Sequence, residues 1–180
     1  AQAEAKANYN FDSLLIPFRC VASDVKNKKQ VIFKNGNLTQ AIRASSTYPF
    51  YIKPIRVDDN LLFDGGIYNN FPMDVIYEDF FPDIILGCNV AGSGDVNPLE
   101  DDVLSQLKAM VLNRTDNVSI CENGIIVQPD MSGIGTFSFD RTTDAYVQGV
   151  IATKERMEEI KSSIGRRTSV ETMTERRTKF

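Results

Sequence analysis

The sequence contains no histidine and no tryptophan among its 180 residues, and it has only three cysteines. Without histidine, this chain cannot build a Ser-His-Asp or Cys-His site, and His-ligated metal sites are excluded as well. Cys20, Cys88 and Cys121 are widely spaced and contain no C-x-x-C pair. An odd number of cysteines without a pattern indicates buried free thiols rather than a disulfide framework or a zinc site.

The sequence also lacks long hydrophobic runs, and the body of the chain, before residue 165, has no excess of basic residues. No apolar run approaches the ~18 residues that a membrane-spanning helix needs. The net charge is −4, and because residues 165–180 carry five Lys/Arg and two Glu, the body of the chain is acidic. An acidic body argues against nucleic-acid binding, which needs a clustered basic face. We expect the basic tail to be a solvated extension or the start of another domain, with attraction to an anionic membrane surface as the alternative.

The composition is that of an ordinary globular chain, with 42% hydrophobic and 24% charged residues, and its length suits one domain or part of one. After an opening hairpin, the apolar pattern predicts helices and strands in alternation. The predicted strands are 14–22, 31–33, 52–57, 83–90 and 124–129. The predicted helices are 37–45, 73–81, 103–111 and 143–164. This order indicates an α/β layered architecture with a mixed, mainly parallel sheet.

One apolar run leads to a single carboxylate at a break in the chain. Leu61–Phe63 is followed by Asp64, by the pair Gly65–Gly66, and then by Asn69–Asn70. Apolar strands that end in a Gly-rich break often carry working groups in α/β sheets. Asp-Gly between apolar runs is equally the commonest short hairpin signal, so a plain turn is the alternative interpretation.

Sequence motifs for phosphate and metal binding are weak. There is no G-x-x-x-x-G-K-[ST] motif, and Gly133-Ile134-Gly135 lacks the third glycine of a dinucleotide fingerprint. The carboxylate clusters Asp58–Asp59 and Glu100–Asp102 are expected to be surface turns or a helix start. A divalent-cation site at such a cluster is a minor alternative. We therefore expect no cofactor and no metal.

Three segments stand out when they are taken together: Leu15–Asp24, Leu38–Pro49 followed by Pro54, and Phe63–Pro72. In their order and spacing they resemble the second half of the patatin-like phospholipase domain. The resemblance implies a three-layer α/β/α fold with a mixed, mainly parallel sheet, of which this chain forms part. It also implies lipid acyl-ester hydrolysis by a Ser-Asp dyad without a catalytic histidine.

The resemblance also assigns roles to residues. The catalytic aspartate of the family stands in a D-G-G or D-G-A motif, which matches Asp64, Gly65 and Gly66. Asp64 is then the general base that takes the proton from an attacking serine hydroxyl. The glycines let the backbone approach the nucleophile closely. Asn69 and Asn70 are expected to brace the turn rather than to touch substrate.

The sequence departs from the family at the nucleophile, because it contains no G-x-S-x-G motif. At the two glycine positions of that motif, Ser93 has Ala91 and Asp95, and Ser132 has Asp130 and Ile134. The Gly-rich oxyanion loop is missing as well. We therefore interpret residues 11–164 as the C-terminal part of a patatin-like acyl hydrolase domain. Residues 1–10 are expected to be the remnant of an upstream helix, and residues 165–180 a basic polar tail or linker. The isolated chain is expected to be inactive.

The expected substrate is a lipid or another acyl ester. The expected partners are the missing N-terminal half of the domain, a membrane surface and a second copy of the chain that pairs through uncovered sheet edges; nucleic acid is not expected. The protein is expected to be membrane-peripheral and of bacterial type. The alternative function is that of a non-catalytic α/β interaction module in which Asp64–Gly65 is only a turn.

Overall fold

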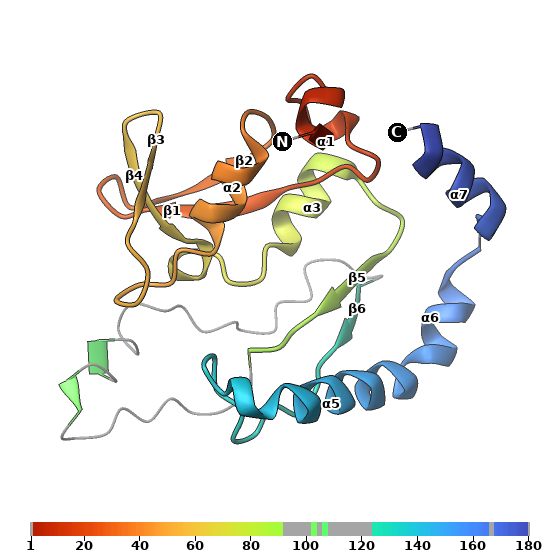
Figure 1. Ribbon diagram of the computed structural model, residues 1–180. Helices are drawn as coiled ribbons and strands as arrows, with labels where there is room; N and C mark the ends of the chain where they lie inside the picture. The colour runs from red at the N-terminus through yellow and green to blue at the C-terminus, as the bar shows by residue number, and fades with distance from the viewer. Residues whose placement is uncertain (1, 92–101, 104–105, 108–123, 166–167, 180) are drawn as a thin grey trace. The chain divides into compact units, whose positions relative to one another are not determined.

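The computed structural model describes residues 2–91, 102–103, 106–107, 124–165 and 168–179 (Figure 1). The described chain divides into two compact units. The first unit takes in residues 2–75, 102–103, 106–107 and 168–179. The second unit takes in residues 76–91 and 124–165. The candidate carboxylate, Asp64, belongs to the first unit.

The first unit is built on a four-stranded antiparallel sheet. Its strands are β1 (Cys20–Asp24), β2 (Lys29–Phe33), β3 (Ile55–Val57) and β4 (Asn60–Asp64), in the order β2-β1-β4-β3. Tight turns join β1 to β2 and β3 to β4, and connections this short require neighbouring strands to be antiparallel. Ala22 of β1 and Asp64 of β4 are opposite partners, so Asp64 lies at the edge of the β1–β4 ladder.

Helix α2 (Leu38–Ser45) packs against this sheet. Asn37 caps it, because the Asn37 Oδ1 accepts a hydrogen bond from the Gln40 N–H at 2.9 Å. Ala44 of α2 joins Ala22 of β1 and Leu62 of β4 in the core of the unit. The remaining elements of the first unit are α1 (Gln2–Lys6), α7 (Val170–Lys179) and the 3-10 turns η1 (Phe11–Ser13) and η2 (Gly65–Ile67). Helix α3 (Met73–Phe80) leads from the first unit into the second.

The second unit holds a two-stranded parallel sheet of β5 (Ile85–Cys88) and β6 (Gly124–Val127). It continues through the 3-10 turn η3 (Phe139–Arg141) into helices α5 (Thr142–Glu155) and α6 (Met157–Ser163). Ile125 and Val127 of β6 pack with Ala152 of α5 and Ile160 of α6 into a small core. None of the described helices is long and apolar enough to cross a membrane.

The expected α/β class is confirmed, but the described strands are not mainly parallel. Three strand pairs are antiparallel and one pair is parallel. The reason is that the strand predicted over 52–57 turns back directly into β4 through Asp58 and Asp59. The segment before Asp64 is therefore a second hairpin, and not a strand reached by a helical crossover.

Some predicted boundaries also shift. The strand predicted over 14–22 begins only at Cys20, after Pro17, which has no N–H to give to a ladder. The helix predicted over 143–164 is two helices that meet at Arg156. The predicted helix 103–111 lies mostly outside the described residues. The segment beyond residue 165, expected to be a basic polar tail or linker, contains the ten-residue helix α7.

Candidate functional site

Asp64 ends one element and begins the next. Its backbone N–H donates to the Thr47 carbonyl oxygen at 2.9 Å. Its side-chain Oδ1 accepts a hydrogen bond from the Gly66 N–H at 2.8 Å, which makes Asp64 the cap of the turn η2. The cap holds the carboxylate in one orientation at the carboxyl end of β4.

The Asp64 carboxyl is partly buried, and this burial raises its pKa above the ordinary value of 3.8. The hydrogen bond from the Gly66 N–H acts in the opposite direction, because it stabilises the charged form. Burial is the larger effect. A carboxylate with a raised pKa is a better proton acceptor, and shifts of this kind are common at catalytic sites.

Both glycines after Asp64 lie where an added Cβ would meet a close contact. A Cβ on Gly65 would lie 2.5 Å from the Val21 carbonyl oxygen, which is backbone and cannot move away freely. A Cβ on Gly66 would lie 2.7 Å from the Asn70 Oδ1 and 3.2 Å from the Asp64 Oδ1. The observed close approach is thus between the turn and the protein's own β1. The close approach to a nucleophile, which the resemblance implies, stays a prediction.

Asn69 ties the turn to two other elements. Its Nδ2 donates to the Asp74 carboxylate at 2.9 and 3.1 Å and to the Gln30 Oε1 at 3.0 Å. Its backbone N–H donates to the Gly65 carbonyl oxygen at 2.8 Å. These bonds give Asn69 the bracing role that was expected of it. They join η2 to β2 and to the first turn of α3.

The partners around Asp64 were not evident from the sequence. Thr47 and Ser23 are fully buried polar residues. Ser23 donates from its Oγ to the Gly65 carbonyl oxygen at 3.4 Å, and not to Asp64. In the part of the chain that the structure describes, no serine or cysteine hydrogen-bonds to Asp64. The described residues therefore supply a carboxylate without a nucleophile beside it.

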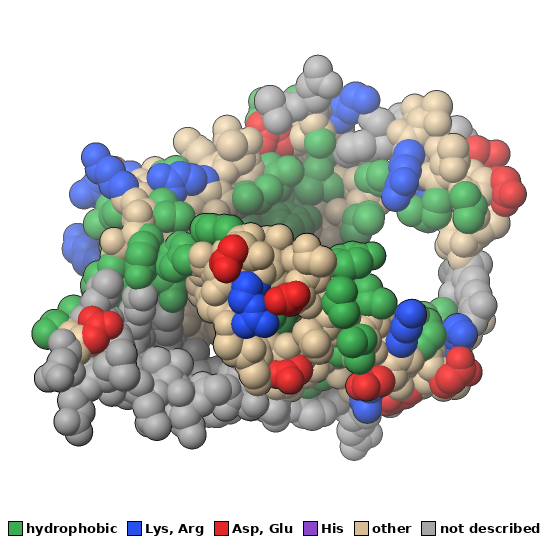
Figure 2. Space-filling view, turned by 60° about the horizontal axis from the view of Figure 1, so that its bottom comes forward, with side chains coloured by type: hydrophobic (Ala, Val, Ile, Leu, Met, Phe, Trp, Pro, Cys, Tyr) green, Lys and Arg blue, Asp and Glu red, His purple; other side chains and the backbone are tan. Residues whose placement is uncertain are grey.

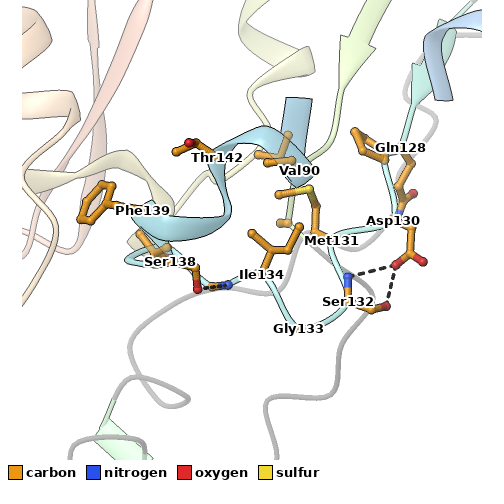
Figure 3. A pocket seen from close by; sticks show the side chains of 15 residues that line it. Val90, Gln128, Asp130, Met131, Ser132, Gly133, Ile134, Ser138, Phe139 and Thr142 are labelled. Carbon is orange, nitrogen blue, oxygen red and sulfur yellow. Dashed lines mark hydrogen bonds between the residues drawn. The ribbon is translucent and has the colours of Figure 1, made fainter. Parts of the chain in front are cut away.

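A cavity of about 1000 Å³ lies in the second unit (Figure 3). Its lining consists of Val90, Ala91, residues 128–136, Ser138, Phe139, Thr142 and Ala145. Asp64 does not line it. The Ser132 Oγ and N–H both donate to the Asp130 Oδ1, at 2.5 and 2.9 Å, and these bonds lower the pKa of Asp130. Because the two residues are neighbours in one turn, this pair is explained by local loop geometry and not by an arrangement for catalysis.

A metal-binding cluster of three or more His, Cys, Asp or Glu residues is not found among the described residues. Asp58 and Asp59 are the exposed turn residues between β3 and β4, as expected. Glu100 and Asp101 lie outside the described residues. The acidic clusters therefore give no support for a cation site in the described chain.

The chain was compared with known proteins. The family model described as patatin-like phospholipase matches residues 4–77, the part that contains Asp64 and the two glycines. An uncharacterized NTE family protein of Mycobacterium tuberculosis is 26% identical over 167 residues, which cover 78% of this chain and 29% of that protein. A second uncharacterized NTE family protein of the same species is 47% identical over 62 residues, 34% of this chain and 17% of that protein.

A putative patatin-like phospholipase domain-containing protein of Caenorhabditis elegans is 23% identical over 181 residues, covering 83% of this chain and 16% of that protein. The chain thus spans less than a third of the length of these relatives. The family match and the names of the relatives agree with the resemblance of the three sequence segments. The chain is thus similar to the patatin-like phospholipase family, and residues 4–77 are the part that the family model covers.

Proposed function

We propose that this chain is part of a lipid acyl hydrolase and that Asp64 is its general base. The observation that carries the proposal is the state of Asp64. It is a partly buried carboxylate with a raised pKa, held in place by the Gly66 N–H, in a D-G-G motif inside the segment that matches the family. Burial and a fixed orientation are what a general base needs in order to accept a hydroxyl proton.

The proposed reaction is the hydrolysis of an acyl ester through a covalent intermediate. A serine oxygen forms a bond to the ester carbonyl carbon while its proton passes to the Asp64 carboxylate. The ester C–O bond then breaks, and the leaving alcohol takes the proton from Asp64. In the second half of the cycle a water oxygen bonds to the acyl carbon while its proton passes to Asp64. The bond between the acyl carbon and the serine oxygen then breaks, the acid leaves, and the serine oxygen takes the proton back from Asp64.

The nucleophilic serine has to come from outside these 180 residues, because the sequence has no G-x-S-x-G motif. The proposal therefore includes an upstream part of the domain as the structural partner of this chain, and it expects the isolated chain to be inactive. The proposed substrate is a lipid ester, and the proposed location is a membrane surface. The greater length of the relatives is in keeping with such an upstream part.

A non-catalytic interaction module is the second candidate, and one observation favours it. The bond from the Gly66 N–H to the Asp64 carboxylate is by itself a sufficient structural reason for an aspartate at this position. In that case Asp64 would stabilise the turn η2 and would take no part in hydrolysis.

Asp64→Asn distinguishes the two candidates. Asparagine is as good a cap as aspartate, because its Oδ1 accepts the same bond from the Gly66 N–H, but it cannot act as a base. The substitution is made in the full-length protein, and hydrolysis of a p-nitrophenyl acyl ester is measured. A loss of kcat/KM of about a hundredfold or more is expected. Asp59→Asn, in an exposed turn, is the matched control. Unchanged hydrolysis with Asp64→Asn would leave only the turn role.

A further inference from the structure

Three consecutive large hydrophobic residues are exposed just after α2. Phe50, Tyr51 and Ile52 have exposed fractions of 54%, 46% and 39%, and we refer to them as the apolar loop. Phe50 has a φ of +68°, a left-handed conformation that side chains other than glycine adopt only at a cost in free energy. The fold therefore tolerates backbone strain at the residue whose ring is most exposed in the loop.

Two cationic residues are linked at the end of the apolar loop: Lys53 follows Ile52 in the chain, and Arg43 bonds to the Lys53 backbone. Arg43, on the last turn of α2, donates from Nη2 to the Lys53 carbonyl oxygen at 3.2 Å and from Nη1 to the Thr47 Oγ1 at 3.1 Å. Both acceptors are neutral, so the charge of the guanidinium is not balanced by them. Within the described chain, neither Arg43 nor Lys53 forms an ion pair. The acidic pair Asp58–Asp59 lies at the other end of β3 from Lys53.

The apolar loop is tied to the candidate site. Tyr51 and Ile52 donate their backbone N–H groups to the Tyr48 carbonyl oxygen, at 3.4 and 3.1 Å. The residue before Tyr48 is Thr47, whose carbonyl oxygen accepts the Asp64 N–H. The loop and the backbone of Asp64 are therefore bonded to two consecutive residues, Thr47 and Tyr48.

Figure 2 shows hydrophobic side chains next to Lys and Arg side chains at the left of the view, the side on which Figure 1 draws α2, β3 and β4. Aromatic residues with an apolar ring and a polar tip are favoured at the headgroup level of a bilayer. Lys and Arg next to them are attracted to anionic lipids. The combination of an exposed apolar loop and unbalanced cations thus fits the chemistry of an anionic membrane surface.

We propose that Phe50, Tyr51 and Ile52, with Arg43 and Lys53, form a docking surface for an anionic lipid bilayer. The three apolar side chains enter the boundary between headgroups and acyl chains, and the two cations lie against lipid phosphates. The choice of lipid rests on the proposed function, because a lipid hydrolase has to meet a lipid surface. Docking by this loop would bring the bilayer to the part of the fold that carries Asp64.

The absence of tryptophan allows a direct test on the 180-residue chain. Phe50→Trp introduces a single indole into the apolar loop, and its emission is recorded with vesicles of phosphatidylcholine and of phosphatidylcholine with phosphatidylglycerol. A blue shift is expected with the anionic vesicles only. Tyr146→Trp is the matched control, because Tyr146 is 73% exposed on α5, outside the proposed surface. No shift is expected from it.

Co-sedimentation with the same vesicles measures the partition coefficient. The double substitution Phe50→Ser/Tyr51→Ser is expected to lower binding at least about tenfold, and Lys53→Gln about fivefold. Tyr146→Ser should bind like the parent chain. Circular dichroism checks that each variant is folded. If the double variant does not fold, the binding of Lys53→Gln still tests the proposal.

Three results would overturn the proposal. One is unchanged vesicle binding by both loop variants, and another is equal binding of the parent chain to neutral and anionic vesicles. The third is concentration-dependent self-association that the loop substitutions abolish, which would make a second copy the occupant. Vesicle binding needs no catalysis, so Asp64→Asn should leave it unchanged. The docking surface and the proposed function can therefore fail separately.

Discussion

Thr47 and Asp64 are joined by a backbone hydrogen bond of 2.9 Å, from the Asp64 N–H to the Thr47 carbonyl oxygen. The Thr47 side chain is fully buried, and its Oγ1 donates to the Arg43 carbonyl oxygen at 2.6 Å while accepting from the Arg43 Nη1. The end of α2 and the end of β4 are thus fixed to each other through one threonine. The position of the candidate base depends on this link.

Thr47→Val should therefore destabilise the first unit. Valine has nearly the same shape, but it cannot donate to the Arg43 carbonyl oxygen or accept from the guanidinium. Loss of these buried bonds is expected to cost about 1–3 kcal/mol. The free energy of unfolding, measured in urea, checks this. Thr39→Val, at an exposed position of the same helix, should change it by less than about 0.5 kcal/mol. Equal effects of the two substitutions would contradict the role assigned to Thr47.

Gly65→Ala should also destabilise the chain, for a steric reason. The added methyl group would lie 2.5 Å from the Val21 carbonyl oxygen, so β1 and η2 would have to separate. Overpacking of this kind costs about 1–3 kcal/mol. Gly149→Ala is the control, because nothing lies within 4 Å of its Cβ position in α5, and there alanine should be neutral or stabilising. Chemical denaturation of both variants measures the difference, and a neutral Gly65→Ala would show that the turn can move.

The raised pKa of Asp64 predicts a dependence of stability on pH. Since its folded-state pKa lies above the ordinary 3.8, the folded chain binds more protons than the unfolded chain between the two values. Stability from this group is therefore fully present below about pH 3.8 and is lost as the pH rises through the folded-state pKa. Asp64→Asn, which is neutral at all pH, should gain stability relative to the parent chain on going from pH 3 to pH 7.

Urea unfolding of the parent chain and of Asp64→Asn at both pH values measures this gain. Asp59→Asn, at an exposed carboxyl in the turn between β3 and β4, is measured in parallel as the comparison. An advantage of Asp64→Asn that is equal at pH 3 and pH 7, or larger at pH 3, would mean that burial does not dominate at this carboxyl.

The parts of the fold that follow from local sequence signals were predictable. The cap at Asn37, the turn at Asp58–Asp59 and the break after Asp64 each depend on residues within a few positions of one another. The site itself is less local. Asp64 depends on Thr47, and Asn69 depends on Gln30, which lies in another strand. No periodicity or motif signals such a partner, because the contact exists only once the strands have their final register.

The direction of the strands was not predictable for a related reason. A buried apolar run has the same pattern whether its neighbour is parallel or antiparallel, and the alternation of helices and strands favoured parallel pairing. In the first unit, the short turns between β1 and β2 and between β3 and β4 make these strand pairs antiparallel. The break at Arg156 is likewise hidden, because the apolar positions continue across it from α5 to α6. Asp64, in contrast, was singled out by its D-G-G motif and by the resemblance, and its role as a general base stays a prediction.

Burial also predicts a difference in reactivity between the described cysteines. Burial raises the pKa of the Cys20 thiol from 9.0 to about 11, so Cys20 is almost entirely protonated near pH 8. Only the thiolate is alkylated, and a rise of this size lowers its fraction about a hundredfold. Cys88 lies on the exposed face of β5. Iodoacetamide at pH 8, followed by mass spectrometry of the peptides, should modify Cys88 about a hundredfold faster than Cys20, and denaturant should abolish the difference. Equal rates in the native chain would mean that β1 opens readily at Cys20. The pairing of β1 with β4, which positions Asp64, would then open as well.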